Sequence, residues 1–165
     1  MEQPLTVQQE LTYKEYLSAM LYVFASSKRA KWYLIGIFGL IMVSNLLGPG
    51  SITAIDLITM LAPLVMMILL FVTFITIACY YIYKSKPYLF HHVSYVFTDW
   101  GVVRHGERTQ FSKPWKEITR FKESKAFFFL YAGKFDVHIF PKKMFADEFE
   151  MEHFKDLVKE NNLKR

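Results

Sequence analysis

The chain has 165 residues, of which 53% are hydrophobic and 18% aromatic, and its formal net charge is +5. A chain of this length leaves room for one small folded domain beside any membrane segments, which excludes a second domain. Cys79 is the single cysteine. An intramolecular disulfide and a cysteine–histidine metal cluster are therefore excluded, and we interpret Cys79 as a small packing residue.

Residues 1–31 are predicted to form a cytosolic N-terminal segment. Its first 11 residues are polar and are expected to be loose. Thr12 and Glu15 have the spacing of a capping box, which predicts an amphipathic helix over about residues 12–27. Such a helix either packs on the soluble domain or the membrane spans, or lies in the headgroup layer. Its apolar face comprises Tyr13, Tyr16, Leu17, Met20, Leu21 and Phe24.

Two uncharged stretches follow, and we predict that both are transmembrane helices. The first, residues 32–47, contains 16 residues and would reach roughly 24 Å as a helix. The second, residues 57–83, contains 27 residues without Asp, Glu, Lys or Arg and would reach roughly 40 Å. The hydrocarbon core of a bilayer is about 30 Å thick, so the second stretch is long enough to cross it and the first is slightly short.

The connection between these stretches, residues 48–56, begins with Gly-Pro-Gly and contains no Lys or Arg. Glycine and proline stop a helix, so the chain is expected to turn here and form a tight antiparallel hairpin. Basic residues flank the hairpin on its other side. The positive-inside rule then predicts an outer loop and two cytoplasmic termini in a multi-pass protein. These basic residues are Lys28, Arg29, Lys31, Lys84 and Lys86.

Residues 84–165 change to the alternating pattern of β-strands. Val93, Tyr95 and Phe97 predict one strand with a buried face. Residues 126–132 are apolar on both faces, which is typical of a central strand, although an exposed face would instead be a docking site. Gly133-Lys134 predicts a two-residue hairpin turn. About six short antiparallel strands are expected.

A C-terminal amphipathic helix is expected to close this sheet. Asp147, Glu148 and Glu150 favour a helix N-terminus, and the helix is predicted to run to about residue 161. Its apolar residues are Phe149, Phe154, Leu157 and Val158. The predicted fold class is therefore an α+β membrane protein with a two-helix transmembrane hairpin and a C-terminal antiparallel sheet or partial barrel closed by one α-helix.

We find no pattern that predicts catalysis, a metal site or a cofactor. Glu150 and His153 form one Glu-x-x-His pair, but a di-iron bundle needs two such pairs and further glutamates. The glycines are scattered and form no phosphate loop. We therefore expect a protein that is not an enzyme.

Basic residues are the candidate interaction site. Residues 84–165 contain 16 Lys and Arg against 11 Asp and Glu, so they carry the whole net charge of +5. Near an anionic leaflet each such charge gains about 1 kcal/mol, so lipid headgroups are one candidate partner and a solvated basic face is the alternative. Interleaved acids argue against nucleic acid. The candidates are Arg104, Arg108, Lys113, Lys116, Lys142 and Lys143.

The chain resembles the YcxB-like family of bacterial membrane proteins. The resemblance lies in the layout of the spans, in Trp115-Lys116-Glu117-Ile118, in the turn at residues 98–102 and in the segment Ile-Phe-Pro-Lys-Lys-Met-Phe at residues 139–145. It implies a pleckstrin-homology (PH)-like cytosolic domain at residues 84–165 and a location in the bacterial cytoplasmic membrane. It supplies no catalytic residue.

Two functions follow as hypotheses. In the first, the protein is integral to the membrane, and its PH-like domain binds a protein or a lipid headgroup at the inner leaflet. In the second, it is an immunity or resistance protein against a membrane-active peptide or toxin. The expected partners are membrane lipids and a protein partner, or a second copy of the chain through the hairpin, and not nucleic acid.

Overall fold

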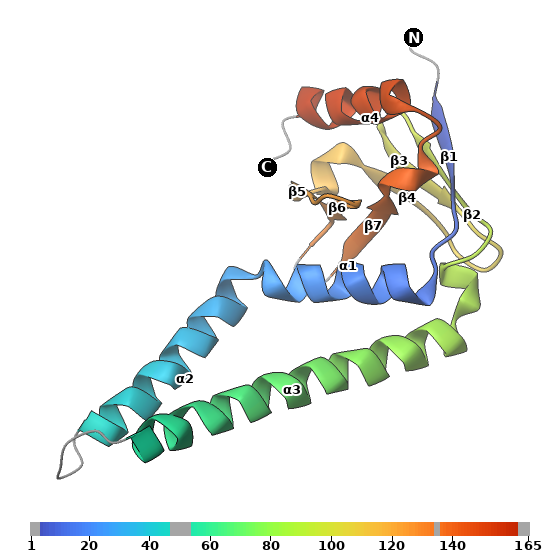
Figure 1. The fold of residues 1–165 in the computed structure, drawn as a ribbon. Helices are drawn as coiled ribbons and strands as arrows, with labels where there is room; N and C mark the ends of the chain where they lie inside the picture. The colour runs from blue at the N-terminus through green and yellow to red at the C-terminus, as the bar shows by residue number, and fades with distance from the viewer. Residues whose placement is uncertain (1–3, 47–53, 134–135, 162–165) are drawn as a thin grey trace. The chain divides into compact units, whose positions relative to one another are not determined.

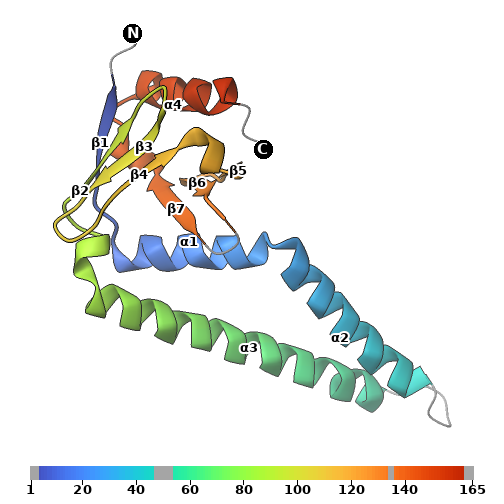
Figure 2. The ribbon, with the colours of Figure 1, turned by 180° about the vertical axis from the view of Figure 1, so that it is seen from behind.

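The computed structural model describes residues 4–46, 54–133 and 136–161. They form a mixed α+β structure with two antiparallel sheets and four α-helices (Figures 1 and 2). The chain divides into two compact units. One combines Met1–Glu15 with Ile82–Arg165, and the other is Tyr16–Tyr81.

The first unit contains both sheets. The four-stranded sheet has the order β1-β2-β3-β4, and the three-stranded sheet has the order β5-β6-β7. All neighbouring strands are antiparallel, and the described strands do not close into one barrel. The strands are β1 (Leu5–Gln9), β2 (Val93–Phe97), β3 (Gly101–His105), β4 (Gln110–Pro114), β5 (Arg120–Glu123), β6 (Phe127–Tyr131) and β7 (Val137–Pro141).

Strand β1 differs from the loose N-terminus expected from the sequence. Leu5 and Val7 are buried and alternate with exposed Thr6 and Gln8, so the strand has one core-facing side. Glutamines obscure this pattern in the sequence, because the buried Gln9 occupies the third inward position. The partner that specifies the strand is β2, which follows only after residues 10–92. Both figures show β1, in blue, beside β2.

The core between the sheets is mainly aromatic. Phe154 from helix α4 (Glu148–Glu160) lies with its ring centre 4.8 Å from that of Phe97 and 5.2 Å from that of Phe128. Phe140 packs against Phe97 at 5.4 Å. Rings at these separations gain from edge-on or tilted contact in addition to burial. Helix α4 therefore joins the two sheets through one side chain of the core.

Strand β6 is the central strand that the sequence predicts. It lies between β5 and β7, and all five of its residues are buried. The run Phe127-Phe128-Phe129 therefore belongs to the core of this unit and is not an exposed docking strand.

Two local predictions are wrong. Tyr131 pairs with Val137, so residues 132–136 connect β6 to β7, and the connection is longer than the predicted two-residue turn. Lys134 itself lies outside the described residues. Phe149 is 77% exposed and does not belong to the buried face of α4, which consists of Phe154, Leu157 and Val158 with the partly buried Met151.

The acidic start of α4 is confirmed, because Asp147 caps the helix by accepting a hydrogen bond from the Glu150 amide.

The helices between β1 and β2 are α1 (Tyr13–Ala25), α2 (Lys28–Leu46) and α3 (Ala54–Ser85). The predicted capping box is confirmed, since Glu15 accepts from the Thr12 amide at 2.9 Å and Thr12 Oγ accepts from the Glu15 amide at 3.4 Å. Among the described residues, only the part of α3 from Leu61 to Ser85 is long and apolar enough to cross a membrane. The predicted outer loop at residues 48–56 falls mainly outside the described residues.

The two phenylalanines of α4 give a direct test of this core. Phe154→Ala removes a ring that is 0% exposed, so we expect the free energy of unfolding to fall by about 3 to 5 kcal/mol. Phe149→Ala removes an exposed ring on the same helix and should change it by less than about 0.5 kcal/mol. The measurement is denaturant unfolding of the full chain in detergent, followed by tryptophan fluorescence. Equal losses in the two variants would contradict the assignment of the core.

Candidate functional site

The six basic residues predicted as an interaction site come from five different parts of the first unit. Arg104 lies in β3, Arg108 follows it in the turn to β4, and Lys113 lies in β4. Lys116 belongs to the 3₁₀ turn Trp115–Glu117. Lys142 and Lys143 begin the 3₁₀ turn Lys142–Met144 after β7.

Arg104 has an internal role and is not available to a membrane surface. It is only 8% exposed, and its Nη2 donates to the Leu89 carbonyl oxygen at 3.2 Å. The guanidinium carbon lies 5.9 Å from the ring centres of both Tyr95 and Phe111. These contacts stabilise a buried cation by hydrogen bonding and by cation–π attraction.

Three of the four lysines are paired with carboxylates. Lys113 contacts Asp136, Lys142 Nζ lies 2.5 Å from Glu123 Oε1, and Lys143 Nζ lies 2.7 Å from Glu15 Oε1. Such partly exposed pairs contribute only about 0 to 1 kcal/mol each to stability. Their effect on the surface is larger, because each pair cancels a charge that the sequence assigns to an open basic face. Arg108, Lys116 and Lys143 are the exposed members of the predicted set, and of these Lys143 is already paired with Glu15.

A polar cluster links the two sheets beside Arg104. The ring of Phe111 in β4 lies 4.7 Å from the ring of His138 in β7. His138 Nε2 lies 3.4 Å from Asp136 Oδ1, and Lys113 contacts the same carboxylate. His138 Nε2 and Arg104 Nε are buried and lack a hydrogen-bond partner among the described residues. His138 is one of five histidines in the chain, and the sequence did not predict this cluster.

Burial lowers the pKa of His138 from 6.5 to about 4. The Asp136 charge opposes this change, whereas Lys113 and Arg104 lower the pKa further. Burial alone would raise the pKa of Asp136, but the hydrogen bond from Lys113 and the nearby positive charges hold it below its usual value. At neutral pH the cluster therefore contains a neutral imidazole, a carboxylate and two cations.

The His138 pKa predicts a pH-dependent stability. The unfolded chain binds this proton below pH 6.5 but the folded chain only below about pH 4, so acidification through this window favours unfolding. The full loss is about 3 kcal/mol. Unfolding of the full chain in denaturant at pH 7.5, 5.5 and 4.5 measures it. The His138→Leu variant should lose most of this dependence, and an unchanged dependence in that variant would contradict the assignment.

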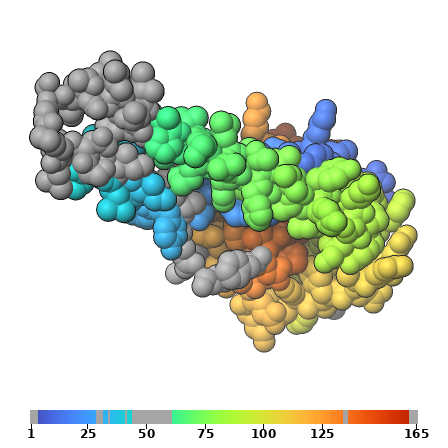
Figure 3. All heavy atoms as spheres, turned by 90° about the horizontal axis from the view of Figure 1, so that it is seen from below, coloured from blue at the N-terminus to red at the C-terminus, as the bar shows by residue number. Residues whose placement is uncertain are grey.

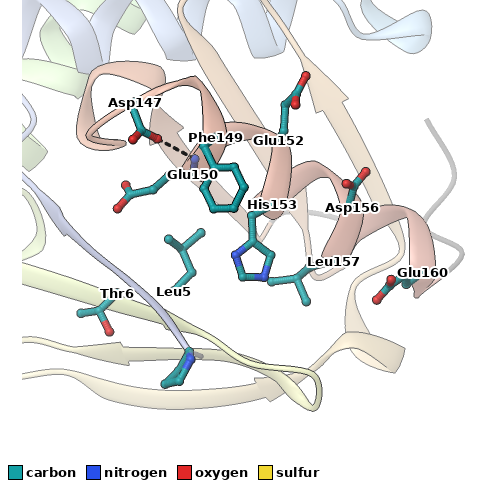
Figure 4. A pocket seen from close by; sticks show the side chains of 11 residues that line it. Leu5, Thr6, Asp147, Phe149, Glu150, Glu152, His153, Asp156, Leu157 and Glu160 are labelled. Atoms are coloured by element: carbon teal, nitrogen blue, oxygen red, sulfur yellow. Dashed lines mark hydrogen bonds between the residues drawn. The ribbon is translucent and has the colours of Figure 1, made fainter. Parts of the chain in front are cut away.

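A groove of about 830 Å³ lies between β1 and α4 (Figure 4). Buried Leu5 and Leu157 form its floor, and the side chains of Phe149 and His153 point from α4 toward β1. Its walls carry five carboxylates and no Lys or Arg among the described lining residues. The lining is completed by Pro4, Thr6, Asp147, Glu150, Glu152, Asp156 and Glu160.

The sequence did not predict this groove, because one of its walls is β1. The spacing of Phe149, His153, Leu157 and Glu160 at steps of three and four is visible in the sequence and places them on one helical face. The sequence spacing could not show that this helical face lies opposite β1. Among the described residues, no group of three or more His, Cys, Asp or Glu side chains is arranged to hold a metal ion.

The family comparison applies to the unit that contains this groove. A family model described as YcxB-like protein matches residues 97–158. This match confirms the resemblance predicted from the sequence, and it extends from the end of β2 through nearly all of α4. No curated protein and no solved structure gives a significant match.

Proposed function

We propose that the chain is a non-enzymatic integral membrane protein of the bacterial cytoplasmic membrane. Helices α2 and α3 would cross the membrane as a hairpin with both termini in the cytoplasm. The unit containing the sheets would be a PH-like domain that binds a protein at the inner leaflet. The two antiparallel sheets with one closing helix, and the YcxB-like match at residues 97–158, support a PH-like fold.

The pairing of β1 with β2 is the observation that carries this proposal. Gln9 faces Val93 and Leu5 faces Phe97, although the three helices α1, α2 and α3 separate the strands in the chain. Strands of one sheet lie on the same side of a membrane. If α3 crosses, the segment between the strands must therefore cross an even number of times. Helix α2 is the natural second crossing.

The surface of α3 also supports a membrane location. Most of the described apolar side chains of Leu61–Ser85 are exposed, and Figure 3 shows them, in green, as a continuous row along the helix. In water such an apolar surface would be strongly unfavourable, whereas hydrocarbon accepts it. Tyr80 and Tyr81 are exposed at its C-terminal end beside Lys84, as is typical of an interface between membrane and water.

Charge favours a protein over a lipid headgroup as the partner. Arg104 is buried, and Lys113, Lys142 and Lys143 are paired, so most of the predicted basic residues are engaged within the domain. A groove lined by five carboxylates would repel an anionic leaflet. Of the six predicted basic residues, only Arg108 and Lys116 are both exposed and outside the described ion pairs, so they are the ones that remain for contact with headgroups.

Cysteine labelling tests the topology. In a Cys79→Ala background, a Ser51→Cys variant should react in intact cells with a membrane-impermeant maleimide, because residue 51 follows α2 on the outer side in this proposal. A Glu107→Cys variant, in the exposed turn between β3 and β4, should react only after permeabilisation. Labelling of Glu107→Cys in intact cells, or release of the protein by alkaline carbonate, would contradict the proposal.

A further inference from the structure

Strand β1 has an available edge. It ends the four-stranded sheet, and among the described residues only β2 pairs with it as a strand, although the turn Lys142–Met144 lies against part of β1 and Gln9 Nε2 donates to the Ile139 carbonyl oxygen. Edge strands in natural proteins are usually protected by a charge, a proline or a bulge, since their free amides and carbonyls accept another strand. The β1 sequence, Leu-Thr-Val-Gln-Gln, contains no charged residue and no proline. The edge is therefore chemically suited to pair with a further strand.

The groove adjoins β1 and offers an apolar contact. Its floor is formed by Leu5 from the strand and Leu157 from the helix, and Phe149 beside them is 77% exposed. Figure 4 shows Phe149, His153 and Leu157 along one side of α4, facing β1. A large exposed ring next to an aliphatic floor is typical of a surface that receives a side chain from a partner.

The charge of the groove selects the partner. The helix provides Asp147, Glu150, Glu152, Asp156 and Glu160, and no Lys or Arg lines the groove. Asp147 and Glu150 also cap α4, and Asp156 contacts Lys159 at 2.5 Å, whereas Glu152 and Glu160 are exposed to solvent. The net charge of the whole chain is +5, so this negative field is local. It favours Lys or Arg in the partner.

We propose that the groove between β1 and α4 binds an extended basic segment of a partner protein. The segment adds as a strand beside Leu5 and Thr6 of β1 and places an apolar side chain against Phe149 and Leu157. Its Lys or Arg side chains lie beside Glu160 and reach the outer rim of the groove at Glu152, whose carboxylate is turned away from β1 (Figure 4). Leu5 and Thr6 are the residues of β1 that line the groove, so the strand pairing involves this end of β1 and the rest of the segment runs along α4. Main-chain hydrogen bonds then supply affinity and the alternate side chains supply specificity.

This inference deepens the proposed function, because it rests on a protein-binding domain and names the chemistry of its partner. A second copy of the chain is the main competing occupant, through pairing of β1 with β1. That arrangement would bring two helices rich in carboxylates together, which electrostatic repulsion disfavours.

Selection from a random nonapeptide library tests the proposal. The full chain in detergent is the target, and selected peptides are synthesised and titrated by fluorescence anisotropy. We expect Lys or Arg together with an apolar residue at alternating positions. Methylation of alternate peptide amides should abolish binding for one set of amides and spare the other, because only one set faces β1.

Matched variants test the groove itself. Glu152→Lys with Glu160→Lys should weaken binding on the order of tenfold or more, and Phe149→Ala should have an effect of similar size. The controls alter exposed residues outside the groove and should change binding less than about twofold. They are Glu107→Lys with Glu117→Lys for charge, and Trp100→Ala for an exposed ring.

Several outcomes overturn the proposal. A library that yields no binding peptide, peptides without basic residues, or equal losses in groove and control variants would each do so. A dimer in sedimentation that Phe149→Ala dissociates would instead identify a second copy as the occupant. None of these outcomes changes the cysteine labelling, so failure of the groove is distinguishable from failure of the membrane topology.

Discussion

The pairing of β1 with β2 is the contact on which the organisation of the chain depends. Closing a segment as long as residues 10–92 costs about 3 kcal/mol more than closing a short hairpin loop. Burial of Leu5 and Val7 contributes roughly 1.5 to 3 kcal/mol for each side chain, which offsets that cost. The N-terminal strand is thereby part of the domain, and it keeps the two ends of the helical segment next to each other.

The aromatic core explains why one helix can hold two separate sheets together. Phe154 packs against Phe97 of the first sheet and against Phe121 and Phe128 of the second. A large rigid ring makes many contacts while losing little conformational freedom, so one position on α4 couples both sheets. The same helix presents its opposite, acidic side to the groove beside β1. Core and groove are therefore set by the rotation of a single helix.

The net charge of the chain describes poorly how charge is distributed over the unit that contains the sheets. The basic excess predicts a positive face, but pairing with Glu15, Glu123 and Asp136 neutralises three of the lysines. The carboxylates of α4 are instead concentrated along one groove. Whether a surface attracts a cation or an anion depends on which unpaired charges lie on it. A small net charge of the whole chain does not show where those charges are.

The sequence by itself determined the elements whose signal is local: the capping box of α1, the apolar stretch of α3, the buried strand β6 and the acidic start of α4. Periodicity and helix capping act within a few residues, so they can be read without a fold. Only the tertiary structure decided the rest. Strand β1 is specified by its pairing with β2, and its buried Gln9 is satisfied by the Ile139 carbonyl oxygen of β7. The exposure of Phe149 depends on how α4 is rotated over the core, and the partners of the lysines lie 19 to 128 residues away in the chain. Contacts between residues so far apart in sequence leave no periodic trace, because they are specified by the packing of the whole domain.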